Sequence, residues 1–193
     1  MSETMETLQK EIRSFIYQKA YEKRRVRLAS GRESDFYIDS KQVTLTAAGI
    51  YKIAFYILHF IQEKGLDVKA VGGPAMGAVP LVGAISALSY QAPFYCPLDT
   101  FYIRNERKEH GTAKLVEGPA LQKGLPVLLV DDVITTGGSI LRAAREVREM
   151  GCRVETLMGI VDRQEGGREN IENEGFKFYA IVTRNELEGP EML

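Results

Sequence analysis

Two adjacent acids, Asp131 and Asp132, stand between an apolar run and a turn of small residues. The segment Val127–Ser139 reads Val-Leu-Leu-Val-Asp-Asp-Val-Ile-Thr-Thr-Gly-Gly-Ser, and a helical pattern follows it. Ionised carboxylates only accept hydrogen bonds, so the pair suits the hydroxyl groups of a sugar or the shell of a Mg²⁺ ion. The free N–H groups of the turn and of the helix N-terminus suit a phosphate. The segment therefore predicts a site for a phosphorylated sugar at the end of a strand.

The same segment also has a purely structural interpretation. It can be an acidic turn before an N-capped helix, because Asp and Thr make local hydrogen bonds in turns. The two acids alone fit that interpretation, whereas the complete order of apolar strand, acid pair, Thr-Thr-Gly-Gly and helix favours a functional site. No Gly-Lys-Ser or Gly-Lys-Thr occurs in the chain, which argues against a P-loop nucleotidase.

Helical and strand-like segments alternate along most of the chain. Apolar runs predict strands at residues 68–73, 93–95, 100–103, 127–130, 153–161 and 176–182. Apolar residues at helical spacing predict helices at residues 4–21, 46–64, 77–90 and 138–150, the last of which turns Arg142, Arg145, Glu146 and Arg148 toward water. Buried strands that alternate with helices predict an α/β fold, a parallel twisted sheet flanked by helices on both faces. Ligands are expected beyond the carboxyl ends of its strands.

A strand that ends at Val130 would let both Asp131 and Asp132 bend toward one crevice, although neighbouring residues within a strand point to opposite faces. The segment 104–124 is polar and largely without periodicity, so it is expected to be a mobile loop. The chain of 193 residues is expected to form a single domain, 1–193.

The composition limits the class of protein. The net charge is −1 and 45% of the residues are hydrophobic, so no global attraction to nucleic acid or to an acidic membrane is expected. The N-terminus lacks the basic and apolar regions of a signal peptide, and the protein is expected to be soluble and cytoplasmic. Cys96 and Cys152 are expected to be reduced thiols and His59 to be structural. No cluster of His and Cys in the sequence suggests zinc.

The acid segment resembles the phosphoribosyl pyrophosphate (PRPP) binding motif of type I phosphoribosyltransferases. Segments similar to those of the orotate phosphoribosyltransferases are found at Leu28–Asp39, Arg104–Gly111 and Gly159–Gly167, and Gly72–Pro80 resembles the family's pyrophosphate loop. The resemblance implies the type I phosphoribosyltransferase fold with a small N-terminal hood, which we place at residues 1–45. It also implies that segment 104–124 is the catalytic loop.

The resemblance implies roles for individual residues. Asp131 and Asp132 would hold the ribose hydroxyls and favour the positive charge that develops on the ribose. The PRPP site would comprise these two acids together with Val133, Ile134, Thr135, Thr136, Gly137, Gly138 and Ser139. Three loop residues, Arg104, Lys108 and His110, would stabilise the departing pyrophosphate, because cations there act most strongly as its negative charge grows.

The orotate site would comprise Ser30, Tyr37, Lys41, Thr135 and Arg163. The planar guanidinium of Arg163 matches a carboxylate, and the flat base could stack on Tyr37 or on Phe36. Three positions depart from the pattern, since Ala29, Gly77 and Asn105 stand where some members carry lysine. Lys41 and Arg107 are possible substitutes for the missing cations.

The predicted reaction transfers the phosphoribosyl group of PRPP to orotate, giving orotidine 5′-monophosphate and pyrophosphate in pyrimidine biosynthesis. The resemblance implies Mg²⁺ held by PRPP and water without a direct protein ligand, and a homodimer in which the catalytic loop reaches the neighbouring site. Two alternatives remain open: transfer to another nucleobase, and a PRPP-sensing regulator without catalysis. The absence of a basic helix weighs against a DNA-binding regulator.

Overall fold

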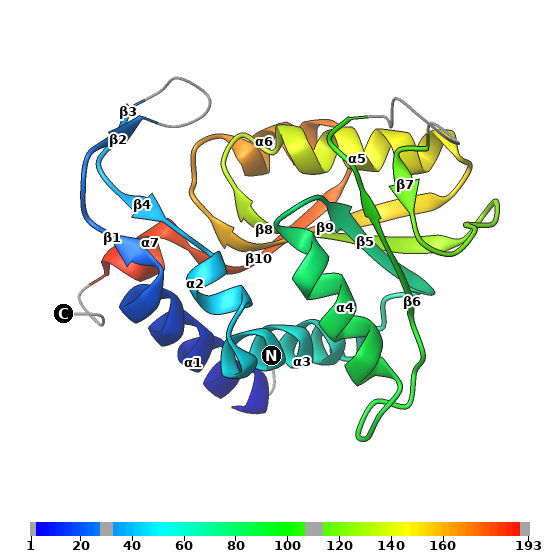
Figure 1. Ribbon diagram of the computed structural model, residues 1–193, viewed down its shortest axis with the longest axis horizontal. Coiled ribbons are helices and arrows are strands. Elements are labelled where there is room, and N and C mark those ends of the chain that lie inside the picture. The colour runs from blue at the N-terminus through cyan, green and yellow to red at the C-terminus, as the bar shows by residue number, and fades with distance from the viewer. Residues whose placement is uncertain (1–2, 28–32, 107–113, 190–193) are drawn as a thin grey trace.

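The computed structural model describes residues 3–27, 33–106 and 114–189, and Figure 1 presents their arrangement. A six-stranded sheet forms the centre, with strands in the order β10-β9-β8-β5-β6-β7. The strands are β5 (Ala70–Pro74), β6 (Asp99–Ile103), β7 (Val116–Glu117), β8 (Pro126–Ile134), β9 (Arg153–Asp162) and β10 (Lys177–Thr183). All neighbouring pairs are parallel except β6 and β7. The predicted parallel sheet is confirmed.

Helices cover both faces of the sheet (Figure 1). The helices of one face are α1 (Glu3–Lys19), α3 (Ala47–Glu63) and α4 (Ala78–Ser89), and those of the other face are α5 (Gly138–Glu149) and α6 (Gly167–Asn173). Two short helices, α2 (Lys41–Thr44) and α7 (Arg184–Glu188), complete the set. Two separate clusters of buried apolar side chains, one on each face, hold these layers together. This burial is the main stabilising term of the fold. No helix of the described residues is both long and apolar enough to span a membrane.

Two small antiparallel sheets, formed by the N-terminal part of the chain, lie beside the main sheet (Figure 1). In one, β1 (Tyr21–Glu22) pairs with β4 (Tyr37–Ile38). In the other, β2 (Val26–Arg27) pairs with β3 (Glu33–Ser34). This region corresponds in position to the hood that we expected within residues 1–45.

Three predicted elements differ from the structure. Residues 93–95 form a turn instead of a strand, because the N–H groups of Phe94 and Tyr95 both donate to the carbonyl of Gln91, each at 3.0 Å. Tyr95 also has a φ of 43°, which is not a strand conformation. The strand expected to end at Val130 continues as β8 to Ile134. Within the segment expected to be a loop, β7 pairs with β6.

Gly73 lies where β5 passes close to its neighbours. A Cβ atom there would lie 2.1 Å from the carbonyl oxygen of Val130 on β8 and 2.4 Å from the Cβ of Ala78 on α4. Both distances are far below van der Waals contact, so only glycine lets β8 and the start of α4 approach β5 this closely.

We expect Gly73→Ala to lower the free energy of unfolding by about 1–3 kcal/mol, because rigid backbone must move to admit the methyl group. Gly83→Ala is the matched control in α4, since a Cβ there meets nothing within 4 Å. That control should raise stability by roughly 0.5–1 kcal/mol through helix propensity. Urea unfolding measures both variants. Equal stability of the two would contradict the close approach at Gly73.

Candidate active site

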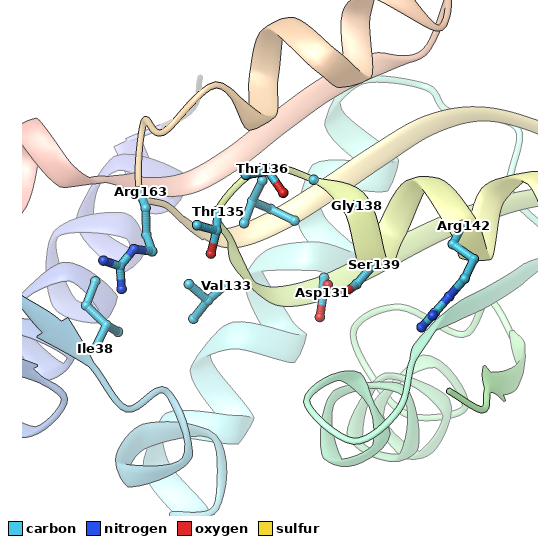
Figure 2. Close-up of a pocket in the computed structure, with 11 residues that line it drawn as sticks. Ile38, Asp131, Val133, Thr135, Thr136, Gly138, Ser139, Arg142 and Arg163 are labelled. Carbon is cyan, nitrogen blue, oxygen red and sulfur yellow. The ribbon is translucent and has the colours of Figure 1, made fainter. Parts of the chain in front are cut away.

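A cavity of about 500 Å³ opens at the carboxyl ends of β8 and β9, the edge at which ligands of parallel sheets bind (Figure 2). Its lining residues are Ile38, Asp131, Val133, Ile134, Thr135, Thr136, Gly137, Gly138, Ser139, Arg142 and Arg163. The structure therefore brings the predicted phosphate turn together with Asp131 and Arg163.

The two acids lie where the alternation of β8 is interrupted, and a side-chain hydrogen bond links their carboxyl groups. Leu129 belongs to the apolar cluster on the α5 face and Val130 to that on the α4 face, but Val133 joins the α4 side and Ile134 the α5 side, so the alternation of β8 is interrupted at the acids. Asp131 lines the cavity. β8 does not end before the acids but continues to Ile134, and the expectation that both bend toward one crevice stays a prediction.

Asp132 faces the N-terminal region and the loop before α4. Its carboxylate accepts a hydrogen bond from the hydroxyl group of Ser40, a residue that is itself buried. A Cβ at Gly77 would lie 2.1 Å from an Asp132 carboxyl oxygen, so the backbone of that loop packs directly on the acid. Gly77, one of the three departures from the family pattern, is thus the residue that makes room for Asp132.

Asp131 is buried, with 7% of the residue exposed. Burial raises its pKa well above the ordinary value, and the neighbouring charge of Asp132 raises the pKa further. The N–H of Asp132 donates to Asp131 at 2.9 Å and favours the ionised form, but it is the smaller influence. In the ligand-free protein the buried acid therefore holds a proton to higher pH than an ordinary aspartate.

The turn before α5 has the geometry of an anion site. Gly137 has a φ of 79°, a left-handed conformation that favours glycine. The side-chain amide of Asn170 on α6 donates to the carbonyl of Thr136 at 2.9 Å and holds the turn in place. The first N–H groups of α5 have no partner within the helix, and Gly138 and Ser139 at the start of this helix line the cavity.

Arg163 follows β9, and its side chain is only 4% exposed although it lines the cavity. Its Nε and Nη2 atoms each lie 2.9 Å from the same carboxyl oxygen of Glu165. The guanidinium also lies over the ring of Phe36, 4.2 Å from its centroid. A buried charge needs such partners, and here they fix the direction of the guanidinium before any ligand arrives.

The hood residues divide into two groups. Phe36 is fully buried, with Arg184 also against its ring at 4.3 Å, so the suggestion that a base stacks on it is wrong. The ring of Tyr37 contacts the guanidinium of Arg24 at 4.8 Å, and Ile38 is the residue of this strand that lines the cavity. The role expected for Tyr37 stays a prediction.

The remaining expected site residues lie away from the cavity lining or outside the described residues. Lys41 pairs with Asp39 at 2.9 Å, an interaction that raises the pKa of the lysine. Arg104 lies 3.6 Å from Glu117 of β7. The described residues do not include Ala29, Ser30, Arg107, Lys108 or His110. Their roles stay predictions.

Four residues at the site were not predicted from the sequence, namely Ile38, Ser40, Arg142 and Glu165. Ser40 and Glu165 lie beside expected residues, but only the tertiary structure reveals which partners they contact. Arg142 lies four residues after Gly138. Residues four apart share one face of a helix, so the spacing could have indicated that Arg142 lies on the side of the phosphate turn. We expected Arg142 to face water and therefore gave it no role at the site. In the structure Arg142 is exposed and also lines the cavity.

The other polar groups of the described residues fit simpler roles. No group of three or more His, Cys, Asp or Glu side chains suited to a metal occurs in the part of the chain that the structure describes. His59 packs against the rings of Phe55 and Phe94, with centroid separations of 4.7 and 5.1 Å, which fits the structural role expected for it.

Comparison with known proteins agrees with this geometry. A family model for the phosphoribosyl transferase domain matches residues 39–183, which include the whole cavity except Ile38. The fold and the site thus define a phosphoribosyltransferase.

Similar proteins indicate which kind of phosphoribosyltransferase this chain resembles. An orotate phosphoribosyltransferase of Pyrococcus horikoshii is 45% identical over 160 residues, covering 83% of this chain and 82% of the relative. One of Sorangium cellulosum is 41% identical over 178 residues, covering 90% of each. The crystal structure of Mycobacterium tuberculosis orotate phosphoribosyltransferase with Fe(III) dicitrate has a TM-score of 0.78 and 32% identity, covering 93% of this chain and 98% of that one. The chain belongs to the orotate phosphoribosyltransferase family.

The raised pKa of Asp131 predicts a pH-dependent change in stability for Asp131→Asn. The folded state binds the proton more tightly than the unfolded state, so wild-type stability falls as pH rises from about 4 through the raised pKa. The amide carries no charge and avoids this loss. We expect the ligand-free variant to be more stable than wild type at pH 8, with the advantage vanishing near pH 4.

Thermal unfolding across this pH range measures the effect. Asp99→Asn, which changes an exposed acid at the start of β6, controls for the loss of one negative charge and should give no such pH-dependent gain. An Asp131→Asn variant that is less stable than wild type at pH 8 would contradict a buried, proton-holding acid.

Proposed function

We propose that the protein transfers the phosphoribosyl group of PRPP to orotate and releases pyrophosphate, as a step of pyrimidine biosynthesis. The observation that carries the proposal is one cavity lined by a buried acid, a phosphate turn and a buried arginine. These groups match the ribose, a phosphate and the carboxylate of orotate. A related orotate phosphoribosyltransferase of Mycobacterium tuberculosis, 31% identical with a TM-score of 0.74, has been crystallised with PRPP.

The reaction replaces pyrophosphate by the base at the anomeric carbon of the ribose. Positive charge develops on the ribose ring as the C–O bond breaks. In the proposed mechanism Asp131 accepts a hydrogen bond from a ribose hydroxyl, and Asp132 acts from the side of Ser40. A cationic ring draws Asp131 toward its ionised form, so the acid stabilises the transition state more than the free enzyme.

The other groups hold the reactants in place. The residues from Thr135 to Ser139 bind a phosphate through N–H and hydroxyl groups. Arg163 binds the carboxylate of orotate with its planar donors, and Ile38 packs against the base. Binding of orotate places a second carboxylate beside Arg163, so part of the guanidinium surface now facing Glu165 is shared with the ligand.

The catalytic loop and the metal complete the proposal. Arg104, Lys108 and His110 are the residues expected to stabilise the leaving pyrophosphate. Mg²⁺ bound to PRPP would neutralise part of the pyrophosphate charge. Asp131 and Asp132 suit such an ion through water, as oxygen donors. We also propose that the protein works in the cytoplasm as a homodimer, as the family resemblance implies.

A direct assay tests the function. The protein is mixed with PRPP, Mg²⁺ and orotate, and the loss of orotate absorbance is followed together with pyrophosphate release. We expect turnover with orotate and none with uracil, adenine or hypoxanthine. Turnover with one of these bases but not with orotate would sink the proposal. PRPP binding without any turnover would favour the regulator.

Arg163→Ala tests the assigned base contact. We expect the Michaelis constant for orotate to rise roughly 10- to 100-fold and that for PRPP to change little, because the lost contact is a charged hydrogen bond to the base alone. Arg184→Ala is the matched control, since Arg184 contacts the same Phe36 ring and pairs with Asp35. An equal rise for both substrates, or the same effect in the control, would assign Arg163 a packing role.

A further inference from the structure

A second arginine, Arg142, lines the cavity at the end away from Arg163. In Figure 2 Arg163 and Ile38 lie on one side of the view and Arg142 on the other, with Asp131 and Ser139 between them. Arg142 belongs to the first turns of α5, on the helix that begins at the phosphate turn. Its guanidinium therefore adds a full positive charge to the end of the cavity where an anion is expected.

The contact that holds Arg142 is neutral. Its Nη2 donates to the side-chain oxygen of Asn105 at 2.9 Å. Arg163, by contrast, is paired with the carboxylate of Glu165. Within residues 3–27, 33–106 and 114–189 Arg142 forms no ion pair. A guanidinium that is oriented by an amide keeps its charge for an incoming anion.

Asn105 lies at the start of the segment 104–124. The N–H of the preceding residue, Arg104, donates to the carbonyl of Leu115 at 2.9 Å and closes the base of this segment. Position 105 is one of the three at which the chain lacks a lysine that some relatives carry. Here the side chain of Asn105 is a neutral acceptor, and the positive charge comes from Arg142 on α5.

We propose that Arg142 is a PRPP-binding residue of this chain and that Asn105 positions its guanidinium. The inference deepens the proposed function, because its ligand is a phosphate group of PRPP. PRPP carries phosphate groups at two places on the ribose, and a helix N-terminus contributes only about half a unit charge toward them. Arg142 supplies a further charge in a planar fork that matches phosphate oxygens.

Direct binding measurements test the role of Arg142. Calorimetry in the presence of Mg²⁺ gives the affinity of wild type and Arg142→Gln for PRPP, pyrophosphate and ribose 5-phosphate. We expect the variant to bind PRPP roughly tenfold or more weakly. Arg145→Gln is the matched control on the same helix, since Arg145 is exposed and paired with Glu174. It removes the same charge and should bind PRPP as wild type does.

The two smaller probes locate the contact. Weaker binding of pyrophosphate alone assigns Arg142 to the leaving group, and weaker binding of ribose 5-phosphate alone assigns it to the 5′-phosphate. Either result supports the proposal, whereas unchanged affinity for all three ligands overturns it. These measurements need no turnover, so an enzyme that fails to use orotate would refute the proposed function and leave this inference standing.

A double-mutant cycle tests the positioning by Asn105. We expect Asn105→Ala to weaken PRPP binding severalfold in wild type and to have little effect when Arg142→Gln is already present. We also expect Asn105→Lys to restore much of the affinity lost in Arg142→Gln, because it returns a cation to the same end of the cavity. The Michaelis constant for orotate should stay near the wild-type value throughout. An equal effect of Asn105→Ala in both backgrounds would overturn the positioning role.

Discussion

Two neighbouring carboxyl groups at the end of β8 impose the constraint on which the rest of the site depends. Burying one carboxylate is costly, and burying two side by side adds their repulsion. A side-chain hydrogen bond between the two carboxyl groups, which requires a proton on one of them, offsets part of this cost. Asp131 holds its proton more tightly, while Asp132 takes the hydroxyl of Ser40 and a close backbone made possible by Gly77. A transition state with a cationic ribose ring therefore interacts favourably with this pair of acids.

The positive charges of the two cavity arginines, Arg163 and Arg142, are held by different kinds of partner. Arg163 is buried, so it requires a carboxylate, and Glu165 together with the ring of Phe36 holds it. Arg142 is exposed, and a neutral amide is sufficient to orient it. The first arrangement fixes the direction of the guanidinium, which suits a planar base that carries a carboxylate. The second leaves the charge available, which suits a strongly charged phosphate.

The sequence predicted the elements that follow from periodicity and the turn that follows from residue type. The alternating strands and helices specified the sheet, and the residues from Thr135 to Ser139, predicted to bind PRPP, line the cavity. Residues 93–95 were misassigned because short apolar runs carry no information about where their N–H groups donate. The length of β8 was also missed, because the two acids interrupt the apolar run although the strand continues through them to Ile134.

The short segment from Phe36 to Ser40 joins the two ends of the site. Phe36 packs on Arg163, Ile38 lines the cavity and Ser40 binds Asp132, all within five consecutive positions of the chain. Only Tyr37 and Ile38 of this segment belong to β4, and Ser40 directly precedes α2. The base end and the ribose end of the cavity are therefore held by one piece of backbone. A change that shifts this segment must disturb the contacts of both substrates, whereas a change at Arg142, on α5, leaves the base end intact.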